Sequence, residues 1–183
     1  MAVLLTIIAT AAVSSSGGGT VLQVEEAGCR IQNDLACARG RAIILRSPQR
    51  LGCDVTAGLY ELTSQDAPGT PIDDPIIKKA YRIFFKKACE TALLADVSRA
   101  ESYPDVELVA ADFDGGEEVV FDAWGFARTA GGNLLTSGEI EIRGGGRSLK
   151  VVVDPATGTA SIQEVAGPPQ TGLLSWLLGG LGI

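Results

Sequence analysis

Three carboxylates stand close together in residues 112–117, a spacing that could bind a cation. Asp112, Asp114 and Glu117 surround the glycine pair Gly115-Gly116. Carboxylates two residues apart beside glycine suit a hard ion, so these residues are a candidate calcium site, although they lack the spacing of an EF-hand. We expect a solvated turn here and no bound metal, with calcium binding as the alternative.

Other patterns exclude several kinds of catalytic site. The chain contains no histidine, which removes Ser-His-Asp and Cys-His catalysis, histidine-ligated metals and an imidazole base. Asp122 near Gly125 resembles half of a carboxylate dyad, but no second Asp-Thr-Gly or similar partner follows. The Ser/Gly run at 14–19 lacks the GK[ST] of a phosphate loop, and we interpret it as a flexible hinge.

The four cysteines are Cys29, Cys37, Cys53 and Cys89, and none forms a CxxC pair, so a zinc ribbon is not expected. Eight helical residues span about 12 Å, which is too far for a disulfide between Cys29 and Cys37. A bridge would have to join one of them to Cys53 or Cys89. The alternative is that the cysteines are small buried apolar side chains.

Length and charge limit the class of protein. The 183 residues are enough for one domain, and the apolar fraction of 46% allows a packed core. The formal net charge is −7, with +2 in residues 1–50 and −9 in residues 51–183. A body this acidic argues against generic binding to a phosphate backbone.

The first element that must position these residues is an apolar N-terminal segment. Residues 2–13 are apolar apart from two threonines, and their helical length of about 20 Å is short of the roughly 30 Å hydrocarbon core of a bilayer. Residues 9–11 resemble a signal-peptide cleavage site, but no basic residue precedes them. The segment therefore looks like the second half of a membrane-spanning helix. Its membrane or filament residues are Ala2, Val3, Leu4, Leu5, Ile7, Ile8 and Val13.

Residues 24–46 predict an amphipathic helix that lies on a sheet and ends at Ser47-Pro48. Arg30, Asp34, Arg39 and other charged residues fall mostly outside its apolar face. That face recurs at spacings of four and three residues: Val24, Ala27, Ile31, Leu35, Ala38, Ala42 and Leu45.

From residue 50 the hydrophobic period changes to two, which predicts a mostly antiparallel β-domain and an α+β fold. The turns at 54–58, 144–146 and 154–158 contain glycine, so the last three strands should form consecutive hairpins. Residues 65–79 predict a loop, and residues 88–97 a short helix. The expected strands are 50–55, 59–64, 80–85, 106–113, 119–124, 138–143, 148–153 and 159–165.

Three stretches of the chain resemble the H-type minor pseudopilins of type II secretion and their type IV pilus relatives, the GspH/FimT-like family. The first is the apolar run 2–13. The second is NDLACARGRAI at 33–43, followed by SPQR at 47–50 and by Asp54, Gly58 and Tyr60. The third is VFDAWGF at 120–126, GEIEI at 138–142, GGRS at 145–148, LKVVVDPATG at 149–158 and ASI at 160–162. The resemblance covers about residues 2–60 and 118–162.

The family also begins with a basic leader, a peptidase site of the GFTLIE type and a glutamate five residues into the mature protein. None of these precedes Ala2. We expect that the start codon is assigned too late or that the chain is truncated, which also accounts for the half-length apolar run.

The resemblance implies a non-enzymatic subunit without a cofactor. It has a pilin fold and is anchored in the inner membrane, with a periplasmic β-domain that assembles into a type II pseudopilus or type IV pilus and supports protein secretion. The implied partners are other minor and major pseudopilins or pilins, the inner membrane and, for a full-length N-terminus, the methylating prepilin peptidase. A secreted β-domain with a signal peptide cleaved near Ala11 is one alternative.

A second alternative is a pilus-tip DNA receptor for natural transformation, because some FimT-like relatives use a basic C-terminal patch. Arg143, Arg147 and Lys150 would form it here, but Glu139 and Glu141 dilute their charge, and DNA is not an expected partner.

The expected organisation is a helix at 1–46, a β-domain at 47–165 and an apolar tail at 166–183. The tail either covers the β-domain or docks to another pilin or a membrane surface. Its docking residues would be Leu173, Leu174, Trp176, Leu177 and Leu178.

Overall fold

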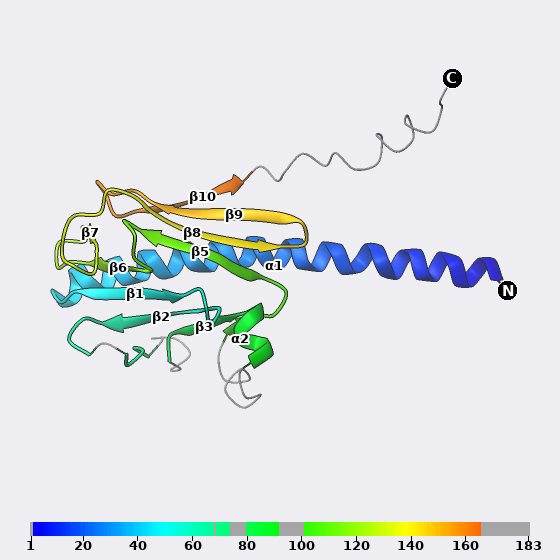
Figure 1. The fold of residues 1–183 in the computed structure, drawn as a ribbon, viewed down its shortest axis with the longest axis horizontal. Helices are drawn as coiled ribbons and strands as arrows, with labels where there is room; N and C mark the ends of the chain where they lie inside the picture. Colours follow the sequence, from blue (N-terminus) through cyan, green and yellow to red (C-terminus); the bar gives the residue numbers. More distant parts are fainter. Residues whose placement is uncertain (1, 68, 74–79, 92–100, 166–183) are drawn as a thin grey trace, which may run out of the picture.

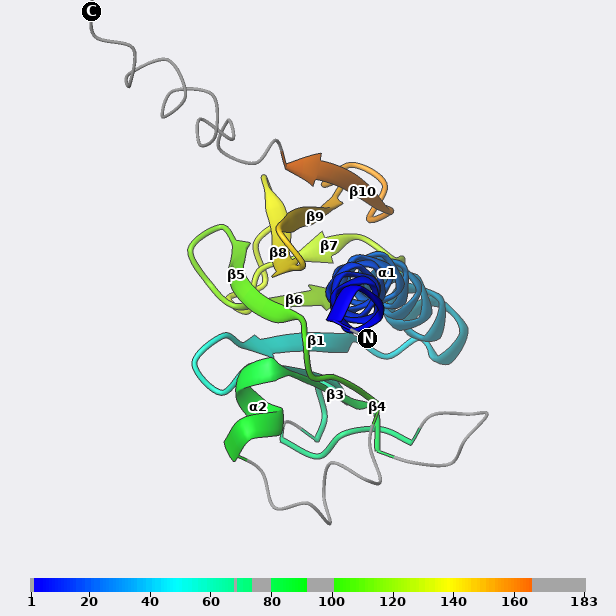
Figure 2. The ribbon, with the colours of Figure 1, turned by 90° about the vertical axis from the view of Figure 1, so that its right-hand side faces the viewer.

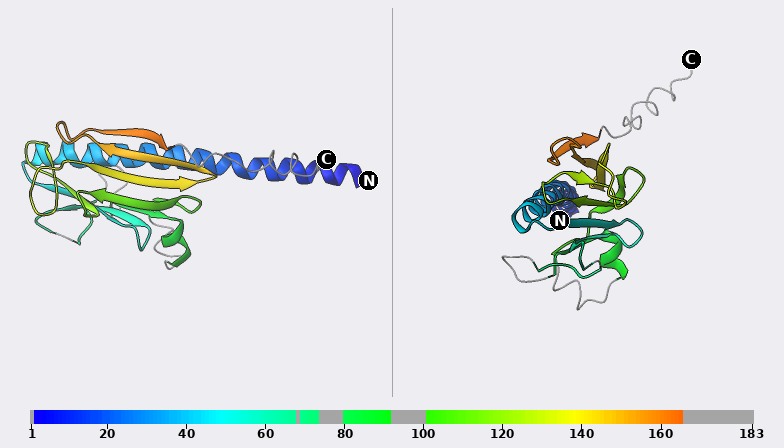
Figure 3. Two further views of the ribbon diagram at one scale, coloured as in Figure 1. Left: turned by 45° about the horizontal axis from the view of Figure 1, so that its top comes forward. Right: turned by 90° about the vertical axis from the view of Figure 1, so that its left-hand side faces the viewer.

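A long helix, α1 (Ala2–Leu45), runs the length of the molecule and packs on β-strands along its C-terminal part (Figure 1). The computed structural model describes residues 2–67, 69–73, 80–91 and 101–165, with side chains of α1 described from Gly19 onward. The apolar tail at 166–183 lies outside the described residues. The N-terminal turns of α1 project beyond the strands (Figures 1 and 3).

The described strands form two sheets. The six-stranded sheet has the order β4-β3-β2-β1-β6-β7, and the four-stranded sheet has the order β10-β9-β8-β5. The elements are β1 (Gln49–Asp54), β2 (Leu59–Ser64), β3 (Arg82–Phe85), α2 (Lys86–Thr91), β4 (Glu101–Tyr103), β5 (Glu107–Phe113), β6 (Glu118–Phe121), β7 (Ala127–Arg128), β8 (Gly138–Gly144), β9 (Arg147–Val153) and β10 (Ala160–Val165).

Helix α1 contacts strands of both sheets, β1 and β6 of the first and β8, β9 and β10 of the second. Figure 2, which looks along the helix, shows β1 below it and β9 and β10 above it. This α+β arrangement of one helix on mostly antiparallel sheets confirms the predicted fold class. The core is therefore the space shared by the helix and both sheets.

The apolar face of α1 is buried as its spacing predicted, except at its end. Val24, Ala27, Ile31, Leu35, Ala38 and Ala42 are fully buried against the sheets. Leu45 is 54% exposed, so its assignment to that face is wrong. The helix ends at Leu45. Arg46 then adopts a positive φ of 51° and turns the chain toward β1, so Leu45 stays at the exposed end of the helix.

The hinge expected at residues 14–19 is also wrong, because α1 is continuous through them. Glycine and serine are poor helix formers, but extending an existing helix costs far less than starting one. The packed part of α1 supplies that start. Thr20 and Val21 lie against the β8–β9 turn, so the helix is held immediately after the Ser/Gly run.

The hairpins of the second sheet confirm the prediction for the C-terminal strands. β8 pairs with β9 and β9 with β10, both antiparallel and through the turns at 144–147 and 154–159. Two strands were missed, β4 and β7, because segments of three and two residues are too short to show a period. β4 pairs parallel to β3, whereas strands joined by a short turn pair antiparallel, so turn signals alone do not predict this pairing. The helix expected at 88–97 corresponds to α2, which begins two residues earlier, at Lys86. Residues 92–97 of the expected helix lie outside the described residues.

Candidate functional site

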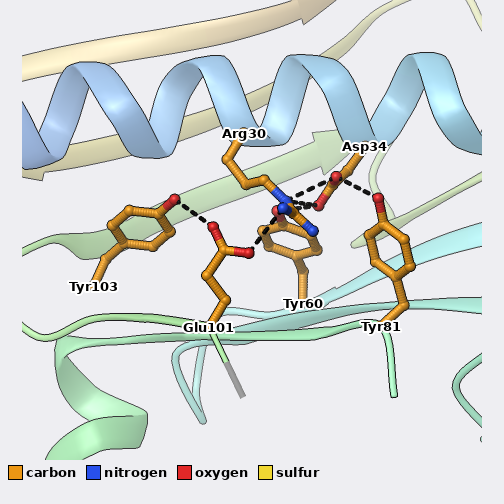
Figure 4. A network of polar contacts seen from close by, with 6 residues as sticks. All are labelled: Arg30, Asp34, Tyr60, Tyr81, Glu101 and Tyr103. Carbon is orange, nitrogen blue, oxygen red and sulfur yellow. Dashed lines mark hydrogen bonds and ion pairs between the residues drawn. The ribbon is translucent and has the colours of Figure 1, made fainter. Parts of the chain in front are cut away.

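A carboxylate buried between α1 and the first sheet is the centre of a polar network (Figure 4). Asp34 is 1% exposed and lies at the middle of the packed part of α1. It accepts hydrogen bonds from the Tyr60 and Tyr81 hydroxyls, each at 2.7 Å. One turn earlier on the helix, Arg30 Nε lies 3.0 Å from the same carboxylate. Each oxygen of the carboxylate thus accepts from a tyrosine on the sheet side, and the arginine supplies the opposite charge.

The network continues from Arg30 to the edge of the sheet. The Arg30 guanidinium forms an ion pair with Glu101 of β4 at 2.8 Å and lies over the Tyr81 ring, 5.3 Å from its centroid. Tyr103, also of β4, donates to Glu101 at 3.0 Å. The six residues join α1 to β2, to the residue before β3 and to β4. The network therefore fastens the outer strands of the six-stranded sheet to the helix.

The electrostatics of the network favour a fixed arrangement of protons. Burial raises the pKa of Asp34 above its ordinary value, although hydrogen bonds from Tyr60 and Tyr81 and the charge of Arg30 each act to lower it. Burial and the neighbouring Asp34 raise the pKa values of the Tyr60 and Tyr81 hydroxyls. Both tyrosines consequently stay protonated and act as donors, which makes the cluster a structural fastening.

Sequence reasoning missed this network because it placed Asp34 off the buried face. One signal was present: Asp34 directly precedes Leu35 and follows Ile31 by three residues, so it stands at the border of the apolar face. Its i,i+4 spacing from Arg30 was a second signal. The tyrosine partners are 26 and 47 residues away, and only the folded chain brings them to Asp34.

The structure does not gather the candidate calcium ligands. Asp114 accepts hydrogen bonds from the amide and hydroxyl groups of Thr136 and Ser137. Asp112 caps the turn by accepting from the Gly115 amide, and Glu117 accepts from the Val55 amide. Within the described residues no group of three or more Asp, Glu or Cys side chains is placed to hold a metal ion. In the described structure these carboxylates therefore order the β5–β6 turn and its neighbours.

Each basic residue of the patch considered for the DNA-receptor alternative is paired with a carboxylate. Lys150 Nζ lies 2.7 Å from Glu139 across the β8–β9 pair. Arg143 contacts Glu141 at 3.4 Å and donates to Ser148. The patch therefore offers no uncompensated charge to a phosphate backbone.

Arg147, the third residue of this set, joins two elements. It pairs with Glu164 of β10 at 3.0 Å and with Glu25 of α1. These contacts raise the pKa of its guanidinium. Its role in the structure is to tie the β8–β9 turn and β10 to the helix.

Asp122, considered above as half of a dyad, shapes the β6–β7 connection. Its carboxylate accepts from the Trp124 and Phe126 amides at 3.0 Å and pairs with Arg128 at 2.6 Å. Burial acts to raise the pKa of Asp122, but the Arg128 hydrogen bond and the two amides outweigh it, so the pKa lies below its ordinary value. An ionised Asp122 thus holds Trp124 and Phe126 in place at the surface.

All four cysteines are free thiols. Cys53 is buried, and burial raises the pKa of its thiol. Cys37 and Cys89 are half-buried, whereas Cys29 is exposed on α1, contrary to the interpretation of the cysteines as buried side chains.

The residues predicted for the membrane or filament, Ala2 to Val13, form the first turns of α1. The described helices include none that is both long enough and apolar enough to cross a lipid bilayer.

Comparison with known proteins gave one structural similarity. No protein-family model matches the chain, and no curated protein matches it. Among solved structures, the type IV minor pilin FimU of Pseudomonas aeruginosa strain PAO1 is similar at a TM-score of 0.45 and 14% sequence identity. The similarity covers 79% of this chain and 93% of that one.

Proposed function

We propose that this chain is a structural, non-enzymatic subunit of a pilus-like filament, a minor pseudopilin of type II secretion or a minor type IV pilin. The observation that carries the proposal is the form of α1, a single helix of 44 residues. Its C-terminal part is buried on both sheets, and its N-terminal turns project beyond them (Figure 1). A helix of this form can join a filament through its free end while the sheets hold the other end.

The chemistry of the projecting segment supports the same proposal. Its residues from Ala2 to Val13 are apolar, with two threonines. Such a segment leaves a lipid environment at low cost only where other apolar helices replace the lipid, as in a helical bundle. We infer that the segment lies in the inner membrane before assembly and among the helices of other pilins afterward, with the β-domain in the periplasm.

The resemblance of residues 2–60 and 118–162 to the GspH/FimT-like family is the second support. We do not propose the DNA-receptor alternative, because Arg143, Arg147 and Lys150 all have carboxylate partners. The secreted-domain alternative makes a different prediction for the N-terminus of the mature protein, which the following experiment uses.

The test is fractionation of the cells that carry the gene natively, with the chain detected in inner membrane, sheared filaments and periplasm. We expect it in the membrane and filament fractions. Ile7→Asp combined with Ile8→Asp should remove it from both, because a carboxylate at the centre of an apolar helix costs about 3 kcal/mol on transfer to a bilayer. Leu22→Asp, at an exposed leucine of the same helix, is the matched control.

Mass spectrometry of the mature N-terminus completes the test. An N-methylated residue ahead of Ala2 would indicate processing by a prepilin peptidase. A free N-terminus near Ala12, together with a chain that is soluble in the periplasm, would overturn the filament proposal in favour of a secreted domain.

A further inference from the structure

The end of α1 that faces away from the projecting segment carries an exposed apolar surface. Ile44 is 81% exposed and Trp124 75% exposed, with Ile43 and Phe126 less so. The backbone of Gly125 joins the two parts of this surface: a Cβ placed on it would lie 2.7 Å from Ile43 Cδ1. Figure 1 shows the end of α1 and the β6–β7 connection at the same end of the molecule. We call these four residues, with Arg39 and Arg46, the distal surface.

The charge of the distal surface differs from that of the rest of the described chain. Arg39 donates to the Gly125 carbonyl at 3.2 Å, and within the described residues neither it nor Arg41 nor Arg46 forms an ion pair. The other described arginines all pair with carboxylates: Arg30, Arg50, Arg82, Arg128, Arg143 and Arg147. In a protein of net charge −7, two of the three described arginines without an ion pair, Arg39 and Arg46, thus lie on the same side of the helix end as Ile43.

Hydrogen bonds fix the backbone on the Trp124 side of the distal surface. Asp122 accepts hydrogen bonds from the Trp124 and Phe126 amides and forms an ion pair with Arg128. Arginine and large aromatic residues held on a rigid support are the residue types that contribute most to protein interfaces. The aliphatic Ile43 and Ile44 argue against nucleic acid as the occupant, since base recognition uses aromatic stacking and a groove lined with basic residues.

We propose that the distal surface binds a partner protein that presents apolar side chains ringed by carboxylates. This inference rests on the proposed function, since a filament subunit must contact its neighbours and this surface lies at the end of the molecule opposite the projecting segment. The arginines select an acidic partner, and Trp124, Ile43 and Ile44 supply the apolar contact. Charge complementarity of this kind raises the association rate and excludes basic partners.

The test places a photoreactive phenylalanine analogue at Ile44 in the full-length chain, in the cells that carry the gene natively. We expect a crosslink to one protein whose crosslinked peptide contains Asp or Glu. Arg39→Glu with Arg46→Glu should lower the yield at least tenfold, and changing the partner's carboxylates to lysine should restore it. Lys86→Glu with Lys87→Glu, an equal charge change at exposed residues of α2, is the matched control and should leave the yield unchanged.

The same cells report on the filament separately. Crosslinks to nucleic acid, lipid or a second copy of this chain, an unchanged yield in the arginine variant, or no crosslink would each overturn the inference. If the chain is absent from filaments but the charge-dependent crosslink persists, the proposed function fails and the distal surface stands. If the chain enters filaments without that crosslink, the filament function stands and the distal surface fails.

Discussion

Asp34 is the residue whose environment most directly couples the helix to the strands. Its two oxygens accept from tyrosines that belong to different parts of the first sheet, and Arg30 balances its charge. A buried carboxylate is stable only with such partners, because removing a charge from water is costly unless other groups replace the lost hydration. The stability of the helix-to-sheet contact therefore depends on each member of the network.

Asp34→Ala should reduce the free energy of unfolding by about 3–5 kcal/mol, because it leaves Arg30 without its buried partner and two tyrosine hydroxyls without an acceptor. The measurement is denaturant unfolding followed by circular dichroism. Asn33→Ala, at the exposed neighbouring position, should change the value by less than about 0.5 kcal/mol. Equal effects of the two substitutions would contradict the fastening role of the network.

Asp122 gives a prediction for pH. Its pKa is lower in the folded protein than the ordinary 3.8, so the folded state favours its ionised form. That contribution to stability is complete above the unfolded-state pKa and is lost as the pH falls through the folded-state pKa. The difference in unfolding free energy between the native chain and the Asp122→Asn variant should therefore shrink as the pH is lowered below about 4.

The measurement is denaturant unfolding of both chains between pH 7 and pH 2, with Asp105→Asn as the control for an exposed carboxylate. If the difference between the native chain and the Asp122→Asn variant stays constant over this range, Asp122 does not contribute through its ionised form.

At the scale of elements, the packed part of α1 from Thr20 onward contains two glycines in different surroundings, Gly28 and Gly40. Gly28 is buried, and a Cβ placed on it would lie 3.3 Å from Leu149 Cδ1 and 3.7 Å from Ile162 Cδ1. A Cβ on Gly40 would meet no atom within 4 Å. Both glycines weaken the helix by their backbone entropy, but only Gly28 allows the close approach of the helix to β9 and β10.

Gly40→Ala should stabilise the protein by about 1 kcal/mol, which is the helix-propensity gain of alanine over glycine. Gly28→Ala should gain less or lose stability, since Leu149 must move to admit the methyl group. Thermal or denaturant unfolding of the two single variants compares them directly. An equal gain at both positions would show that the helix does not rely on Gly28 for its approach to the second sheet.

At the scale of the whole molecule, α1 divides into a projecting part and a packed part. The first described contacts of its side chains with the sheets are those of Thr20, Val21 and Val24 at the β8–β9 turn. The buried face follows from Val24 to Ala42. The β-domain and the packed part of the helix therefore share one core, to which the projecting part is an extension.

A chain that starts at Thr20 should therefore fold, with an unfolding free energy within about 0.5 kcal/mol of that of the full chain in detergent. A chain that starts at Gln32 should not fold, because it lacks the buried Val24, Ala27 and Ile31 as well as Arg30. Circular dichroism and gel filtration of the two truncations make the comparison. Failure of the longer truncation to fold would place part of the core ahead of Thr20.

Features that depend on neighbours along the chain could be predicted from the amino-acid sequence alone. The spacing of Val24, Ile31 and Leu35 predicts which side of the helix is buried, because helical geometry repeats every few residues. The turns after Arg143 and Asp154 predict the last hairpins, because a short turn forces adjacent strands to pair.

Features that depend on distant partners became visible only in the folded chain. Asp34 meets tyrosines 26 and 47 residues away, and β4 pairs parallel to β3 across a crossover. Arg147 forms an ion pair with Glu25, 122 residues earlier in the chain. A residue considered for DNA contact is therefore part of an internal ion pair. Periodicity and turn chemistry act over a few residues, whereas the cost of burying a charge depends on what the whole fold packs against it.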